Sequence, residues 1–262
     1  MIETDQKNYI VDSEEIIGEI EYLHEFYSIN LKNERDIVIW LPPSYHYSDK
    51  KFPVLFMQDG QNLFDPNTSF IGHDWKVDEV VNGLIKDRLI QEIIVVGIYN
   101  TKDRLNEYNY FHPTGKRYAA FLIKELKPLI DENYRTFNKA SETALMGSSM
   151  GGLISFQLFW NFPNIFGKAA CMSNSFWVND RQVFKMIKEK ESQFSVKNRL
   201  YIDCGSEETE LIEDFRRMEK ALKKINKEEV FSFGSYVDRG SRHNENDWAK
   251  RLFIPLRFLF GK

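Results

Sequence analysis

Short apolar runs alternate with longer amphipathic stretches along most of the 262-residue chain. Runs rich in β-branched and aromatic residues predict strands, and stretches with apolar positions every three or four residues predict helices. The predicted strands lie within 18–29, 35–41, 52–57, 92–98, 143–146, 166–172, 200–204 and 230–237. The predicted helices cover 77–89, 118–134, 152–160, 180–191, 210–227 and 248–259.

The order of these segments predicts a mostly parallel sheet. The first two strands follow each other directly, and strands and helices alternate after them. Such alternation is typical of an α/β fold whose central sheet carries helices on both faces. The sequence has no internal repeat, low-complexity tract or linker, so we expect a single α/β domain over residues 1–262. Residues 100–116 are predicted to be a long polar and aromatic loop.

The strongest chemical signal lies between the strand 143–146 and the helix 152–160. The five residues from Gly147 to Gly151 read G-x-S-x-G, with Ser149 at the centre. A serine in this setting is typical of a nucleophile elbow, where flanking glycines let neighbouring backbones approach closely. We therefore predict that Ser149 is a nucleophile that attacks carbonyl groups. An ordinary strand-to-helix turn is the alternative.

A serine nucleophile needs a base that accepts its proton. The chain has five histidines, and only His243 follows Ser149 along the sequence. It lies between the last predicted strand and the last predicted helix, which fits the chain order nucleophile, acid, histidine. We predict His243 as the general base, with His112 as the second choice.

The acid that orients the histidine is expected directly after the strand 200–204. Glu208 is the predicted acid, and the neighbouring Glu207 is the residue with which it could be confused. A glutamate suits the role, because the acid has only to orient the imidazole and stabilise its charge. The alternative is a helix N-terminal carboxylate that interacts with the helix dipole.

The oxyanion of an acyl-transfer intermediate needs two preorganised backbone N–H donors. One is predicted at Met150, directly after the nucleophile. The second is predicted at Gln61, in the loop after the third strand, where Gly60 permits a close turn.

Aromatic and charged residues outside this set are candidates for the substrate pocket. They are Asp74, Trp75, Arg104, Glu107, Tyr108 and Trp177. Aromatic side chains beside a polar pair would suit an aryl- or sugar-linked ester. The alternative is that these residues pack a lid and that Arg104 and Glu107 pair with each other. Trp248 is expected to pack beneath the loop that carries His243.

Composition argues against several other classes of protein. The formal net charge is −4 with both signs interspersed, so no nucleic-acid surface is expected. The polar N-terminus lacks the apolar region of a signal peptide, and no apolar run is long enough to span a membrane. Cys171 and Cys204 lie in strand-like runs and are predicted to be reduced thiols of a cytoplasmic protein. The histidines are scattered along the chain, so we expect no metal and no other cofactor.

Taken together, these residues resemble the putative esterase family, which includes enterochelin esterases, feruloyl esterase modules and mycolyltransferases. The stretches that carry the resemblance are 39–45, 55–65, 147–152 and 243–245, followed by Trp248. The resemblance covers almost the whole chain and implies an α/β-hydrolase fold with a Ser-His-acid mechanism. The family's acid lies three residues after the glycine that ends the penultimate strand, which corresponds to Glu208. Its second oxyanion donor corresponds to Gln61.

The residues and the resemblance predict a serine carboxylic-ester hydrolase that acts through an acyl-enzyme on a small-molecule ester. Three alternatives stay open. An acyltransferase, or a thioester hydrolase such as S-formylglutathione hydrolase, would use the same residues. A hydrolase-fold binding protein would bind a ligand or partner without catalysis. The 21 Phe and 12 Tyr fit either core packing or an apolar interface in a homodimer.

Overall fold

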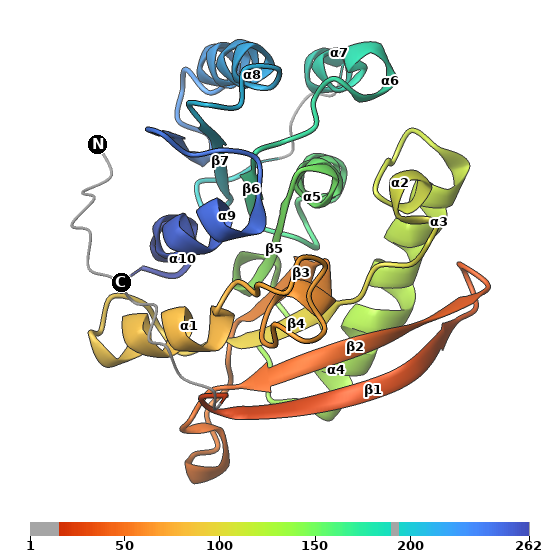
Figure 1. Ribbon diagram of the computed structural model, residues 1–262, viewed down its shortest axis with the longest axis vertical. Helices are drawn as coiled ribbons and strands as arrows, with labels where there is room; N and C mark the ends of the chain where they lie inside the picture. Colours follow the sequence, from red (N-terminus) through yellow and green to blue (C-terminus); the bar gives the residue numbers. More distant parts are fainter. Residues whose placement is uncertain (1–15, 190–193, 262) are drawn as a thin grey trace.

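One twisted sheet runs through the centre of the computed structural model, which describes residues 16–189 and 194–261 (Figure 1). The sheet has eight strands in the order β1-β2-β4-β3-β5-β6-β7-β8. The strands are β1 (Glu19–Ser28), β2 (Asn33–Leu41), β3 (Val54–Gln58), β4 (Ile94–Ile98), β5 (Thr143–Ser148), β6 (Lys168–Met172), β7 (Arg199–Gly205) and β8 (Ser232–Asp238).

The pairing of these strands confirms a mostly parallel sheet. Strand β2 pairs antiparallel with both β1 and β4, whereas β4, β3, β5, β6, β7 and β8 run parallel to one another. Strands β3, β4, β5 and β6 are wholly buried, as expected when both faces of a sheet are covered by helices.

Helices cover both faces of the sheet (Figure 1). The helices are α1 (Val77–Lys86), α2 (Arg104–Glu107), α3 (Pro113–Phe121), α4 (Lys127–Asn133), α5 (Met150–Asn161), α6 (Val178–Arg181), α7 (Val183–Glu189), α8 (Ile212–Ile225), α9 (Glu245–Arg251) and α10 (Phe253–Phe260). The end of the predicted helix 180–191 lies outside the described residues.

The core is divided between the two faces by the side-chain alternation of the strands. In β3, Val54 and Phe56 join the cluster beneath α3, α5 and α8, whereas Leu55 and Met57 join the cluster beneath α1, α9 and α10. Each strand is thereby fixed in register from both sides, so its carboxyl end projects a defined residue at the edge of the sheet.

The segment 100–116, predicted to be a loop, is partly helical. It contains α2 and the first turn of α3, which begins at Pro113 with the Nδ1 of His112 accepting a hydrogen bond from Thr114 N (3.2 Å). Proline suits the first turn of a helix because its missing N–H has no intrahelical partner there. The helix predicted over 118–134 is interrupted by a π-helical turn at Leu122–Leu126, just before Pro128, which cannot donate to the regular ladder.

The parallel strands bring distant parts of the sequence to one edge of the sheet. Residues that follow β3, β5, β6, β7 and β8 all emerge there, because the carboxyl ends of parallel strands coincide.

In 16–189 and 194–261, no helix has the length and apolar character needed to cross a bilayer.

Candidate active site

Ser149 occupies a strained turn between β5 and α5. Its backbone has φ 56° and ψ −120°, a conformation that L-residues with side chains rarely adopt. Tight packing explains the flanking glycines: a Cβ on Gly147 would lie 2.7 Å from the carbonyl carbon of Gly151, and one on Gly151 would lie 2.9 Å from the Cβ of Gln58. Larger residues at these positions would push α5 away from β3. The turn therefore has the geometry that the G-x-S-x-G pattern predicts.

His243 lies between Ser149 and Glu208. Its Nε2 is 2.9 Å from the Oγ of Ser149, and its Nδ1 is 2.8 Å from the Oε2 of Glu208. The structure thus brings together three residues that are far apart in the sequence. His112, the second choice for the base, instead caps α3.

Glu208 is buried, and its carboxylate is surrounded by donors. Ser173 Oγ (2.6 Å) and Gly205 N (2.7 Å) both bind its Oε1. Burial alone would raise the pKa of Glu208, but the hydrogen bonds from His243, Ser173 and Gly205 together hold the pKa below its usual range. Glu207 is exposed and binds the hydroxyl of Ser206, so Glu208 is the glutamate that reaches the imidazole.

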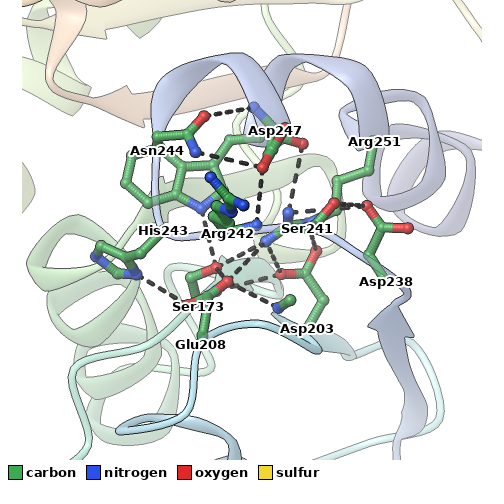
Figure 2. Close-up of polar contacts among 12 residues, drawn as sticks. Ser173, Asp203, Glu208, Asp238, Ser241, Arg242, His243, Asn244, Asp247 and Arg251 are labelled. Atoms are coloured by element: carbon green, nitrogen blue, oxygen red, sulfur yellow. Dashed lines mark hydrogen bonds and ion pairs between the residues drawn. The ribbon is translucent and has the colours of Figure 1, made fainter.

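A second layer of polar residues surrounds this carboxylate (Figure 2). Ser173 Oγ lies 2.9 Å from the Nε1 of Trp248 and 2.7 Å from the Nη2 of Arg251. Arg251 is in turn paired with Asp203, at 3.1 Å between Nη2 and Oδ1. Sequence reasoning missed Ser173 and Arg251, although the position of Ser173 directly after a predicted strand was a usable signal.

The loop that carries His243 is fixed on both sides. Trp248 packs edge-on against the imidazole, with the ring centroids 4.9 Å apart, which confirms the expected packing beneath this loop. Asn244 caps α9 by accepting a hydrogen bond from Asp247 N (3.0 Å), and Asp247 Oδ2 accepts one from Arg242 N (2.7 Å). These contacts restrict the imidazole to one position above Ser149.

The two predicted oxyanion donors follow neighbouring strands. Met150 is the first residue of α5, and Gln61 lies in the 3₁₀ turn Gly60–Asn62 after β3, which pairs with β5. Gly60 is required by space, because a Cβ there would lie 2.6 Å from the carbonyl carbon of Gly97. The side chain of Gln61 is bound elsewhere, because its Oε1 accepts a hydrogen bond from Asn100 N (3.2 Å). The assignment of both backbone N–H groups as oxyanion donors stays a prediction.

Two of the six predicted pocket residues are accessible. Trp177 is 52% exposed in the segment after β6, four residues beyond Ser173. Arg104 is partly exposed and makes a bidentate pair with Asp59, at 2.7 and 2.8 Å. Asp59 directly precedes the turn that carries Gln61, so Arg104 reaches the predicted oxyanion loop.

Glu107 and Tyr108 are not pocket residues, and the structure corrects both predictions. Both side chains are fully buried. Glu107 forms a buried bidentate ion pair with Arg35, at 2.7 and 3.0 Å, and Tyr108 accepts a hydrogen bond from the backbone N of Asp59 (3.1 Å). The alternative pairing of Arg104 with Glu107 is therefore wrong as well. The pairing was predicted wrongly because the true partners, Arg35 for Glu107 and Asp59 for Arg104, lie far from them in the sequence.

Asp74 and Trp75 were also predicted to line the pocket, and both are buried. Trp75 packs against Trp248, with the ring centroids 5.9 Å apart, so it supports the histidine loop from below. Burial raises the pKa of Asp74. These two residues belong to the packing beneath the site. Within the described ranges, no group of three or more His, Cys, Asp or Glu side chains could hold a metal ion.

Comparison with known proteins identifies the family to which the chain belongs. The sequence profile of the family described as putative esterase matches residues 28–259. The chain belongs to this family, which supports an esterase that hydrolyses a small-molecule ester.

Individual proteins are similar to this chain over most of its length. The uncharacterized protein YbbA of Bacillus subtilis is 26% identical over 247 residues, which cover 87% of this chain and 93% of YbbA. The BES protein from Bacillus cereus has a similar structure, with a TM-score of 0.76 and 21% identity over 97% of this chain and 99% of that one. The enterobactin esterase FES from Shigella flexneri gives a TM-score of 0.74 and 21% identity over 94% of this chain, which spans 60% of FES. The similarity to these structures confirms the α/β-hydrolase fold.

The buried ion pair of Glu107 with Arg35 contributes to the stability of the fold. Glu107→Ala leaves the buried Arg35 charge without its partner, so we expect the free energy of unfolding to fall by about 3–5 kcal/mol. Urea denaturation measures this change, and Glu132→Ala, at an exposed glutamate of α4, is the control, with an expected change within about 0.5 kcal/mol. An unchanged stability together with a raised KM for esters would return Glu107 to the pocket.

Proposed function

We propose that the protein is a serine carboxylic-ester hydrolase that works through an acyl-enzyme on Ser149. The observation that carries the proposal is the unbroken hydrogen-bonded chain from Ser149 Oγ through the imidazole of His243 to the buried Glu208. A serine hydroxyl aligned with an imidazole, whose other nitrogen is held by a carboxylate, is the arrangement that activates serine toward carbonyl groups.

In the acylation half of the reaction, Ser149 Oγ attacks the ester carbonyl carbon and His243 Nε2 takes the hydroxyl proton. The carbonyl oxygen becomes an oxyanion, which accepts hydrogen bonds from the N–H groups of Met150 and Gln61. His243 then donates the proton to the alkoxide oxygen, the C–O bond breaks and the alcohol leaves.

In the deacylation half, a water molecule replaces the alcohol. His243 Nε2 removes a proton from the water, which attacks the acyl carbon and passes through a second oxyanion. The Ser149–acyl bond breaks, and Ser149 recovers its proton from His243 as the carboxylic acid is released. Glu208 stays ionised throughout, because the hydrogen bonds that it accepts outweigh its burial and hold its pKa below the usual range.

The proposed substrate is a small ester with an aryl or sugar-linked part. The exposed indole of Trp177 offers an apolar surface in the segment after β6. Ser175, in the same segment, has its Oγ 3.2 Å from the Oγ of Ser149, so this segment borders the nucleophile. Arg104, paired with Asp59, lies partly exposed beside the oxyanion loop.

The nucleophile is tested by removing its hydroxyl. We expect Ser149→Ala to lower kcat for p-nitrophenyl acetate by about three orders of magnitude or more, since loss of a triad member has effects of that size. Circular dichroism and thermal melting establish that the variant is folded. A wild-type protein without turnover, or a variant as active as the wild type, would refute the proposal.

The acid is tested by a pair of neighbouring substitutions. Glu208→Gln keeps the size of the side chain but removes the charge that holds the Nδ1–H tautomer of His243, so kcat is expected to fall about 10⁴-fold. Glu207→Gln changes the exposed carboxylate of the neighbouring residue and is expected to change kcat less than about twofold. Equal losses in the two variants would show that His243 does not depend on Glu208.

A further inference from the structure

Ser173 lies where three hydrogen-bonding side chains meet beneath the candidate site (Figure 2). It directly follows β6, and its side chain is fully buried. Its Oγ is 2.6 Å from Glu208 Oε1, 2.7 Å from Arg251 Nη2 and 2.9 Å from Trp248 Nε1. A buried hydroxyl with three partners has no freedom left in the direction of its proton.

The identity of the partners determines where that proton points. Indole and guanidinium nitrogens are donors only, and a hydroxyl has one proton and two acceptor lone pairs. Trp248 and Arg251 therefore fill both lone pairs of Ser173 Oγ. The single hydroxyl proton is left for Glu208, the one partner that can accept it.

Glu208 connects Ser173 to the imidazole that faces the nucleophile. Its Oε1 accepts from Ser173 Oγ and from Gly205 N, and its Oε2 faces His243 Nδ1 at 2.8 Å. An ionised carboxylate only accepts, so Nδ1 carries the imidazole proton and Nε2 presents its lone pair to Ser149. The protons of Ser149 Oγ and His243 Nδ1 then point toward Glu208 from one side, and the proton of Ser173 Oγ points toward it from the other.

We propose that Ser173, held by Arg251 and Trp248, is a positioning residue that fixes the ionised state of Glu208 and, through it, the reactive tautomer of His243. This inference rests on the proposed function and adds one buried residue, Ser173, to the arrangement of Ser149, His243 and Glu208. Ser173 acts through Glu208 and does not touch the reacting atoms.

The ion pair of Arg251 and Asp203 holds Ser173 in place. Asp203 Oδ1 and Oδ2 accept from Arg251 Nη2 (3.1 Å) and Nε (3.2 Å). The backbone N of Ser173 donates to Asp203 as well, to its O (3.0 Å) and its Oδ1 (3.2 Å). Asp203 therefore holds both the backbone of Ser173 and the guanidinium that donates to its hydroxyl. Asp203 alone thereby sets the position of the Ser173 hydroxyl relative to Glu208.

The charged and titratable groups around Glu208 come from several elements. They are His243 from the loop after β8, Arg251 of α9 at 3.6 Å, and Asp203 and Cys204 of β7. Asp238 of β8 lies 4.0 Å from Arg251 and acts on Glu208 through it. Loss of the Ser173 hydroxyl removes a donor from Glu208 and makes the carboxylate more basic. A more basic carboxylate holds the protonated imidazole more strongly, so the proton that blocks the base leaves at higher pH.

The test compares the pH dependence of kcat/KM for p-nitrophenyl acetate in the wild type and in Ser173→Ala. We expect the acid limb of the profile to move upward by about one pH unit in the variant. Ser28→Ala is the matched control, because Ser28 is equally buried and its Oγ accepts a hydrogen bond from the nearby Leu31 N (3.0 Å), in the turn after β1 and away from Glu208. A purely structural role for Ser173 would lower activity equally at every pH and leave the limb in place.

Ser173→Gly guards against a folding defect. Ser173 has φ 45°, a conformation that glycine adopts without strain, so this variant loses the hydroxyl while the turn is preserved. The acid limb of the kcat/KM profile is expected to move to higher pH by the same amount in Ser173→Ala and in Ser173→Gly. An acid limb at the wild-type pH in a folded Ser173→Gly protein would overturn the proposal.

A measurement without substrate separates this inference from the esterase proposal. Proton NMR of the His243 Cε1–H, assigned by its loss in His243→Asn, gives the titration of the imidazole directly. The midpoint should rise in Ser173→Gly and stay unchanged in Ser28→Ala. If the wild type hydrolyses no ester, the proposed function fails, and the NMR titration alone still supports or overturns the role of Ser173.

Discussion

The arrangement of the candidate site depends on keeping one buried carboxylate ionised. A charge removed from water is costly unless hydrogen bonds and opposite charge replace the solvent. Glu208 receives this compensation from Ser173, from Gly205 N and from His243, with Arg251 at 3.6 Å. Because these donors come from separate elements, the carboxylate ties together the ends of β6 and β7, the loop after β8 and helix α9.

The sheet makes this compensation possible. Parallel strands deliver Ser149, Ser173 and Gly205 to the same edge, and the two halves of the core hold the strands in register. The strained backbone at Ser149 is retained because Gly147 and Gly151 allow β3, β5 and α5 to pack without side chains between them. Because the packing behind the site is rigid, the groups that face the substrate do not have to reorganise during the reaction.

Much of this organisation could be predicted from local sequence patterns. The strands, the elbow at Ser149 and the positions of His243 and Glu208 follow from periodicity and chain order, which act over short stretches or along the whole chain. The burial of Glu107 could not be predicted, since it depends on Arg35, which is 72 residues away. The burial of Trp75 depended in the same way on a distant contact, that with Trp248. Such pairings arise only once the tertiary fold brings the partners together.

The most direct test of the central claim is covalent labelling with a fluorophosphonate, followed by intact-protein and peptide mass spectrometry. The account predicts one phosphonyl group per chain, located on Ser149, and a labelling rate at least about 10³-fold lower in His243→Ala, because the hydroxyl then lacks its base. Labelling at another serine, or an equal rate without His243, would contradict it.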